Sequence, residues 1–335
     1  MVSRPTVSIR GGGIAALSCT KLLTDGGFPV AIDRLERVTV PTIMLSDLAV
    51  ELIRDVFQRP DAFAAAKRIT KRVVLWGEGA APVELPHSAI VLSEKTLLDK
   101  LEFDLPVHEG VASHWTVWSS RPLPDGSIEH GFGSRRATAA RVQLHPTVDN
   151  STCWVESLDS GWLFLVPGPN SEGWLLSMGD KPEISLSQSK LVVHQIAQVH
   201  AIAGDFPAYP RILAPLCTPD WFACGSAAIA FDPICGDGTA NAIREAILLS
   251  ASIRAIETGE PAEDVLAHYR ARLTVGFQKH LAMCREFYAT GGSGDWWTTE
   301  LAALRQGFFW CEAQMQNHAG YDYRLDSDRL VRINC

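Results

Sequence analysis

The chain has 335 residues, of which 47% are hydrophobic, so it is long and apolar enough to bury a core without disulfide bonds. Its formal net charge is −8 at pH 7 and its basic residues are scattered, which argues against a nucleic-acid or membrane-surface partner. No segment approaches the roughly 20 apolar residues that span a bilayer, and the first residues lack the apolar run of a secretory signal, so we expect a soluble cytoplasmic protein.

The cysteines and histidines show no spacing typical of a metal site. The eight cysteines contain no Cys-x-x-Cys pair, and the histidines contain no H-E-x-x-H pattern. We therefore expect reduced thiols and no bound metal.

A strand, a tight turn and a helix are predicted at the start of the chain, over residues 7–10, 11–13 and 14–24, with a second strand over 30–32. Gly11, Gly13 and Ala16 fit the G-x-G-x-x-G/A fingerprint of dinucleotide-binding proteins. The first glycine permits the sharp turn, the second lets a diphosphate approach the backbone, and the small third residue lets helix and strand pack closely. The diphosphate would lie at the helix N-terminus.

An acidic residue follows this turn at the distance that the fingerprint requires. Asp33 comes 20 residues after Gly13, at the end of the second predicted strand, where a carboxylate accepts hydrogen bonds from ribose hydroxyls. Such an acid favours NAD or FAD over NADP, and Arg34 follows it directly.

The middle of the chain predicts an antiparallel sheet. The segment "WLFLVPGPNSEGWLL" (162–176) alternates in hydrophobicity and is interrupted by Pro-Gly-Pro-Asn, as a β-hairpin should be. His87 begins another predicted strand, "HSAIVL", that we expect to line a substrate cavity.

A second strand-turn-helix signal lies late in the chain. An apolar strand runs into Cys224 and Gly225, a loop with Asp232 and Pro233 follows, and a helix is predicted over 239–257. Two phosphate-type turns in one chain indicate an extended ligand that is contacted at both ends, such as a dinucleotide with a large ring.

These two turns together resemble the FAD-dependent monooxygenases of the p-hydroxybenzoate-hydroxylase and tryptophan-halogenase group. The segment "GSAAIAFDPICGDG" matches the group's G-D-A-x-x-x-x-D-P-x-x-G-x-G motif, except that Ser226 replaces the aspartate. The resemblance implies that residue 226 faces the flavin ribityl chain and that the loop after it faces the isoalloxazine. The FAD-binding residues are then expected to be Gly11, Gly13, Ile14, Ala15, Ala16, Asp33, Arg34, Gly225, Ser226, Asp232, Pro233, Gly236, Gly238 and Thr239.

Three further segments carry the resemblance more loosely. "GFGSRRATAAR" (131–141) is similar to the group's D-A-T-G-R-x-A, with Gly133, Arg136 and Ala137 as equivalents, and "WLFLVP" is similar to W-x-W-x-I-P. "REFYATGGSGDWW" (285–297) resembles helices of the flavoproteins that mature quinone cofactors by hydroxylating a protein tryptophan. The expected substrate-binding residues are Trp162, Phe164, Pro167 and His87.

The resemblance implies hydroxylation of an electron-rich aromatic substrate through a flavin C4a-hydroperoxide. The substrate is expected to be indole-like, either a small molecule or a peptidyl tryptophan, and no catalytic side chain is assigned. Because no second dinucleotide turn is present, electrons would come from NAD(P)H that visits transiently or from an external flavin reductase.

Three alternatives stay open: a halogenase, an FAD-dependent oxidase or dehydrogenase, and a non-catalytic flavin-fold binding protein. A halogenase needs a lysine that meets hypohalous acid. Lys67 and Lys71 lie near the expected region, but "AAAKRITKR" does not reproduce the halogenase motif and is interpreted as solvated helix-end charge. Lys95 is expected where relatives place an arginine near the flavin.

The predicted fold class is α/β, with a Rossmann-type FAD-binding domain, an inserted antiparallel substrate sheet and a helical C-terminal region. The FAD-binding domain is expected to be discontinuous, over residues 1–75, 101–145 and 210–260. The substrate sheet is expected over 76–100 and 146–209, and the helical region over 261–335.

Overall fold

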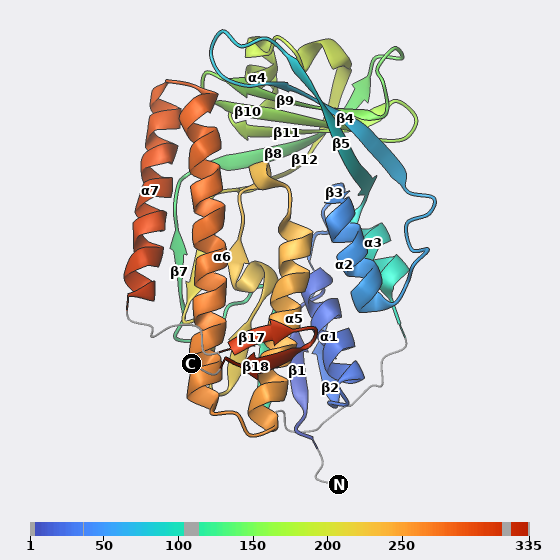
Figure 1. Ribbon diagram of the computed structural model, residues 1–335. Helices are drawn as coiled ribbons and strands as arrows, with labels where there is room; N and C mark the ends of the chain where they lie inside the picture. The colour runs from blue at the N-terminus through green and yellow to red at the C-terminus, as the bar shows by residue number, and fades with distance from the viewer. Residues whose placement is uncertain (1–3, 36, 104–113, 317–322, 334–335) are drawn as a thin grey trace.

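The computed structural model describes residues 4–35, 37–103, 114–316 and 323–333. It contains a five-stranded sheet and an eight-stranded sheet. Figure 1 shows the larger sheet above the smaller one, with two long helices, α6 (Ala262–Gly291) and α7 (Asp295–Met315), beside them.

The five-stranded sheet carries the first glycine turn. Its strand order is β14-β15-β6-β1-β2, and β1 (Val7–Arg10) pairs in parallel with both β2 (Val30–Asp33) and β6 (Trp115–Trp118). The other members are β14 (Cys217–Thr218) and β15 (Trp221–Ala223). The crossover between β1 and β2 is α1 (Ile14–Asp25), so the predicted strand-turn-helix-strand is confirmed.

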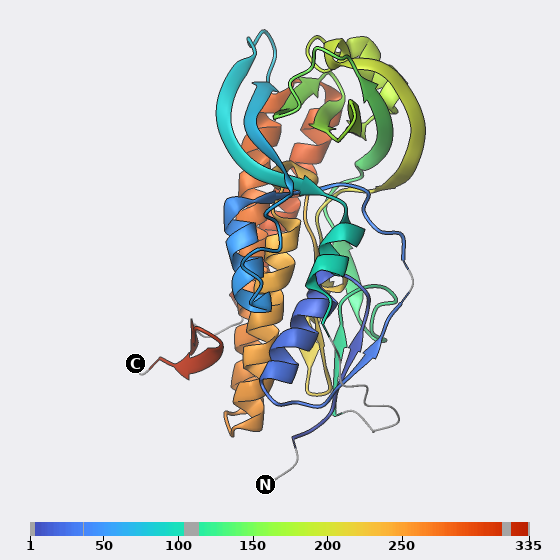
Figure 2. The same ribbon diagram turned by 90° about the vertical axis from the view of Figure 1, so that its right-hand side faces the viewer.

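The eight-stranded sheet has the order β12-β8-β11-β10-β9-β4-β5-β3 and contains the predicted hairpin. Figure 2 shows that this sheet is strongly curled, with β5 and β12 bowed outward on opposite sides of it. Its strands are β3 (Ile43–Ser46), β4 (Lys67–Leu75), β5 (Val83–Leu92), β8 (Arg136–Leu144), β9 (Thr152–Leu158), β10 (Gly161–Pro167), β11 (Glu172–Gly179) and β12 (Ile196–Pro207).

Alternation along β10 separates the two faces of this sheet. Leu163 and Leu165 join an outer apolar cluster, whereas Trp162 and Phe164 face the main core. We call the face that carries Trp162 and Phe164 the inner face, because it is directed toward the rest of the molecule.

The remaining elements connect and cover the two sheets. The N-caps of α2 (Asp47–Phe57) and α3 (Glu94–Leu101) are Ser46 and Ser93, whose hydroxyls accept backbone N–H bonds. The others are α4 (Pro182–Gln188), α5 (Gly238–Glu257), the short helices η1 (Val193–Gln195), η2 (Gly225–Ala227) and η3 (Pro233–Cys235), and the strands β7 (Ile128–Gly131), β13 (Arg211–Ala214), β16 (Ile229–Ala230), β17 (Tyr323–Asp326) and β18 (Arg329–Arg332).

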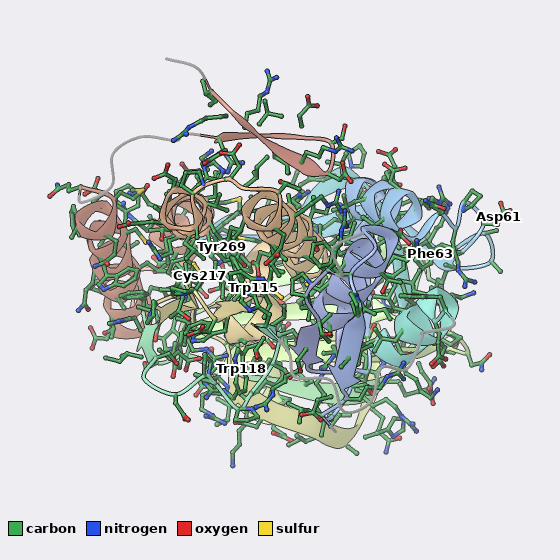
Figure 3. The ribbon with its side chains drawn as sticks, turned by 90° about the horizontal axis from the view of Figure 1, so that it is seen from below. Asp61, Phe63, Trp115, Trp118, Cys217 and Tyr269 are labelled. Atoms are coloured by element: carbon green, nitrogen blue, oxygen red, sulfur yellow. The ribbon has the colours of Figure 1, made fainter. Side chains whose placement is uncertain are left out.

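Buried aromatic side chains fix the smaller sheet against the helices. Figure 3 shows Trp115 and Cys217 of the smaller sheet close to Tyr269 of α6. The Trp115 indole donates to Glu257 Oε1 at 2.8 Å, and the Tyr269 hydroxyl donates to the carbonyl of Ala223 at 2.6 Å. These contacts hold β15, which leads into the second glycine turn, and β6, which pairs with β1 next to the first turn.

The predicted α/β fold class is confirmed, but five strands differ from the predicted domain bounds, of which β17 and β18 lie within the region 261–335 that was predicted to be helical. Strands β3, β4 and β8 lie in the eight-stranded sheet, although residues 1–75 and 101–145 were assigned to the FAD-binding domain. β3, β4 and β8 each pair with at least one strand that is not their neighbour in the sequence, which no local pattern reveals. No helix among the described residues is long and apolar enough to cross a membrane.

Candidate functional site

The first turn requires glycine at residue 11. Gly11 has φ +137°, and a Cβ there would lie 2.1 Å from Ser119 Oγ. Gly13 is the N-cap of α1 with φ −99°, a conformation open to any residue, and no side chain caps the helix there. The N-terminal N–H groups of α1 are therefore left for a ligand.

Sequence reasoning missed an arginine that lies over this turn. The Arg37 guanidinium lies 2.8 Å from the position of a Cβ on Gly13 and forms an ion pair with Glu94. Glu94 also accepts the backbone N–H of Val40 at 2.8 Å. This places a held cation where the fingerprint puts a diphosphate, and no motif around Arg37 signals it.

A cavity of about 190 Å³ opens at the first turn. Arg34 lines it, and Asp33 ends β2 beside it with an exposed side chain. Lys95 also lines this cavity, with its Nζ 2.7 Å from Asp99 Oδ2, so it lies at the first turn and not at the loop 236–239. The lining residues are Gly11, Gly12, Gly13, Ala16, Leu17, Thr20, Ile32, Arg34, Thr39, Lys95, Leu98, Asp99 and Glu102.

The second turn packs directly on the first. Gly225 has φ +57°, and a Cβ there would lie 2.6 Å from the Cβ of Ala15. The Ser226 hydroxyl is exposed and donates to the carbonyl of Ser119 at 3.3 Å, the residue whose Oγ borders Gly11. Two turns predicted separately thus meet at Ser119.

A buried carboxylate accepts a hydrogen bond from the backbone of the second turn. The backbone N–H of Gly225 donates to Glu245 Oε2 at 2.6 Å. Burial raises the pKa of Glu245 to about 8, and the N–H bond from Gly225 opposes the shift.

The side chain of Asp232 does not face an open site. Asp232 is 1% exposed, and its carboxylate accepts from Ile234 N at 2.9 Å, Arg135 Nε at 2.8 Å and the Tyr288 hydroxyl at 2.9 Å. In this segment, a ligand can therefore be contacted only by the backbone of the residues that follow Asp232, and not by the Asp232 side chain.

The loop after Asp232 and Pro233 is open. Gly236 has φ +63°, and a Cβ on Gly236 or on Gly238 would meet nothing within 4 Å. Thr239 follows in the first turn of α5, where the backbone N–H groups lack helical partners. The structure thus leaves room at the positions predicted to face the flavin.

Arg135 joins two buried carboxylates. Its side chain is 0% exposed and pairs with Asp232 at 2.8 Å and with Glu300. The predicted equivalent of the group's arginine, Arg136, is instead exposed and pairs with Asp205. Gly133, which was also predicted, has φ +129° and lies against the Arg135 and Glu300 side chains.

The β10 residues that were predicted to bind the substrate divide into buried and partly buried side chains. Trp162 is 1% exposed, and its indole donates to the Tyr288 hydroxyl at 3.2 Å, so it has no surface left to bind a substrate. Pro167 is buried as well, whereas Phe164 is only partly buried on the inner face. Sequence reasoning missed Trp174 of β11. This residue lies opposite Val166 of β10 and lines a cavity of about 410 Å³.

Lys67 lines the same cavity and was wrongly interpreted as a solvated helix-end charge. It begins strand β4, and its Nζ donates to the carbonyl of Gly168 at 2.6 Å. Burial lowers the pKa of Lys67, while the negative charge of Asp149 opposes the shift. The Lys71 side chain is 41% exposed and pairs with Glu84 at 3.0 Å, so it contacts solvent, but it lies on a strand and not at a helix end.

His87 lies half-buried on β5 with its ring Nε2 3.0 Å from Nη2 of Arg72. Because a guanidinium only donates, Nε2 accepts and the ring proton is on Nδ1. Burial lowers the pKa of His87, the cation of Arg72 lowers it further, and Asp47 opposes both. His87 therefore offers a substrate an N–H group and no free lone pair.

No protein-family model matches the chain. No curated protein matches it in sequence either.

Solved structures do share its fold. The flavin-dependent halogenase CmlS matches with a TM-score of 0.77 and 16% identity over 92% of this chain and 71% of that chain. QhpG, a peptidyl tryptophan dihydroxylase essential for tryptophylquinone cofactor biogenesis, matches with a TM-score of 0.72 and 16% identity over 98% and 86%. HpxO from Klebsiella pneumoniae, solved as a variant complexed with FAD, matches with a TM-score of 0.63 and 11% identity over 93% and 98%. The predicted resemblance to this superfamily is confirmed at the level of the fold.

Proposed function

We propose that the chain is an FAD-dependent oxidoreductase that inserts an oxygen atom into an electron-rich aromatic substrate. The observation that supports it most is the meeting of the two glycine turns at Ser119, below a curled sheet with an aromatic inner face. Its fold is that of flavin-dependent halogenases and hydroxylases.

The residues present fit FAD. Gly11 and Gly13 leave the backbone free for a diphosphate, and Arg37 supplies a cation there. Ser120 Oγ is buried and has no hydrogen-bond partner among the described residues, and it lies 3.0 Å from the Cβ position of Gly11. Ser226 would contact the ribityl chain, and the N-terminus of α5 would face the flavin pyrimidine edge, where it favours negative charge.

Bound and reduced FAD would supply the electrons with which dioxygen is activated for transfer of one oxygen atom. The chain's own side chains hold the substrate and exclude water. Trp174 and Phe164 offer faces on which a planar aromatic ring stacks. Lys67 would donate a hydrogen bond to a polar group of the substrate from the wall of the 410 Å³ cavity.

The proposed substrate is indole-like. A peptidyl tryptophan is its more specific form, supported by the fold match to QhpG over 98% of this chain and by the resemblance of residues 285–297. Electrons would come from an external flavin reductase or from NAD(P)H, because the sequence contains one dinucleotide fingerprint at its start and no second one of that kind.

Halogenation is the second candidate, and Lys67 favours it. A lysine that is half-buried, with its pKa lowered by burial, lies on the inner face beside Trp174. Such an ammonium group meets the requirement for a lysine that receives hypohalous acid next to an aromatic substrate.

Mass spectrometry of indole and of tryptophan-containing peptides, after incubation with reduced FAD and labelled dioxygen, tests this assignment. We expect the product to gain one labelled oxygen with or without bromide. A bromide-dependent gain of bromine that Lys67→Met abolishes, and that the solvated control Lys71→Met preserves, would move the assignment to a halogenase. Hydrogen peroxide with a dehydrogenated product would make the protein an oxidase.

Ser226 tests the position of the ribityl chain. Ser226→Leu should weaken FAD binding by about 0.5–1.5 kcal/mol for one lost hydrogen bond, plus a steric cost, whereas Ser226→Asp should keep or tighten it. Titration of flavin-free protein measures both, with Ser187→Leu on the exposed part of α4 as the control. Equal affinities for all forms would place residue 226 away from the cofactor.

A further inference from the structure

A cluster of two cysteines and a histidine lies outside the residues assigned to the cofactor. Cys235 ends η3, and His280 and Cys284 lie one turn apart on α6. The two sulfur atoms are 3.6 Å apart, and Cys284 Sγ is 3.4 Å from His280 Nε2. The spacing of His280 and Cys284 is the signal that sequence analysis passed over.

The cluster borders a third cavity, of about 540 Å³, between α5 and α6. Cys235 and His280 line this cavity, whereas Cys284 is buried behind them. A small polar molecule in this cavity therefore meets Cys235 and not Cys284.

The hydrogen bonds of the cluster decide between a metal site and a dithiol. The His280 Nε2 lone pair accepts the backbone N–H of Asp232 at 2.8 Å, so it is already occupied. A metal ion would have to displace that bond and would then have three protein ligands among the described residues. The two sulfur atoms need no such change.

We propose that Cys235 and Cys284 form a redox-active dithiol, with Cys235 as the thiol attacked first and Cys284 as the resolving thiol. The Cys235 sulfur attacks hydrogen peroxide, the O–O bond breaks, and the leaving hydroxide becomes water, which gives a sulfenic acid. The Cys284 sulfur then attacks the sulfenic sulfur, the S–S bond forms, and the S–O bond breaks. Two thiols lose two electrons and one peroxide becomes two waters.

The electrostatics of the pair agree with this order. A hydrogen bond from Cys284 lowers the pKa of Cys235, and burial opposes this shift. Burial raises the pKa of Cys284, which therefore keeps its proton until it attacks.

The chain holds a matched control pair. Cys19 and Cys224 have sulfur atoms 3.7 Å apart, almost the same separation, but both are 0% exposed. The hydrogen bond with Cys19 and burial raise the pKa of Cys224. If proximity alone decided, both pairs would be oxidised. The proposed dithiol predicts that only Cys235 and Cys284 are oxidised.

Closing the bond brings the sulfur atoms from 3.6 Å to about 2.05 Å and ties η3 to α6. Because Gly236 follows Cys235 directly, the oxidised form should hold FAD with a different affinity from the reduced form. This consequence, unlike the disulfide itself, rests on the proposed function.

Peptide mapping tests the proposal on the protein without added flavin, so its result is independent of FAD binding. After hydrogen peroxide and alkylation we expect a Cys235–Cys284 disulfide that dithiothreitol reverses, with Cys19 and Cys224 still as thiols. In Cys284→Ser, dimedone should label Cys235, and in Cys235→Ser it should not label Cys284. The proposal is overturned if no such disulfide forms, if both pairs oxidise equally, or if the protein retains zinc that Cys235→Ser releases.

Discussion

Gly13→Val is expected to yield a folded protein that has lost FAD. Gly13 has ordinary backbone angles, and a Cβ there meets only the flexible end of Arg37, so the fold should tolerate the side chain. The branched group would occupy the space that a diphosphate needs, and flavin per chain after gel filtration should fall below about a tenth of the wild-type value.

The control for this experiment is the same change in a strand. Gly204→Val in β12 places its Cβ 4.0 Å from the nearest side-chain atom, so it should keep its FAD. Gly11→Val should instead fail to fold well, because φ is +137° and Ser119 is in the way. Unchanged flavin occupancy in Gly13→Val would refute the assignment of the first turn.

Arg135→Leu is expected to destabilise the protein by about 3–5 kcal/mol. The change leaves Asp232 and Glu300 buried without their cation, since both are about 1% exposed. It also removes the guanidinium that lies 4.6 Å from the centre of the Tyr288 ring. Denaturant unfolding measures the loss.

The neighbouring residue provides the control. The Arg136 side chain is 53% exposed and pairs with Asp205, so Arg136→Leu should cost about 0–1 kcal/mol. An equal decrease in the free energy of unfolding for the two variants would mean that the buried ion pairs of Arg135 stabilise the protein no more than the exposed pair of Arg136.

These adjacent arginines also show where sequence reasoning stops. The resemblance selected Arg136, the first residue of β8, and Arg135 lies directly before that strand. Neighbouring residues of an extended chain point to opposite sides, so an offset of one residue exchanges a buried side chain for an exposed one. The register of β8 is set by its pairing with β11 and β12, which lie far away in the sequence.

The first turn was predictable because its constraints are local. Gly11, Gly13 and Ala16 lie within one strand-turn-helix, and the pattern records a local constraint at each: a positive φ at Gly11, and small side chains beside the turn at Gly13 and Ala16. Arg37 was missed because its position over Gly13 depends on an ion pair with Glu94, a residue of another helix.

Lys67 was misinterpreted for a related reason. The alanines that precede it favour a helix locally, but residues 61–65 form turns and Lys67 begins a strand. Its pairing with Val91 of β5 decides the outcome and turns the lysine toward the inner face.

Titration of FAD into flavin-free protein, followed by flavin fluorescence and absorbance, tests the central claim most directly. We predict saturation at about one FAD per chain, competition by adenosine diphosphate at the first turn, and a bound flavin that dithionite bleaches and air restores. A folded chain that stays colourless and binds no FAD would contradict the account and favour a flavin-fold protein that binds another partner.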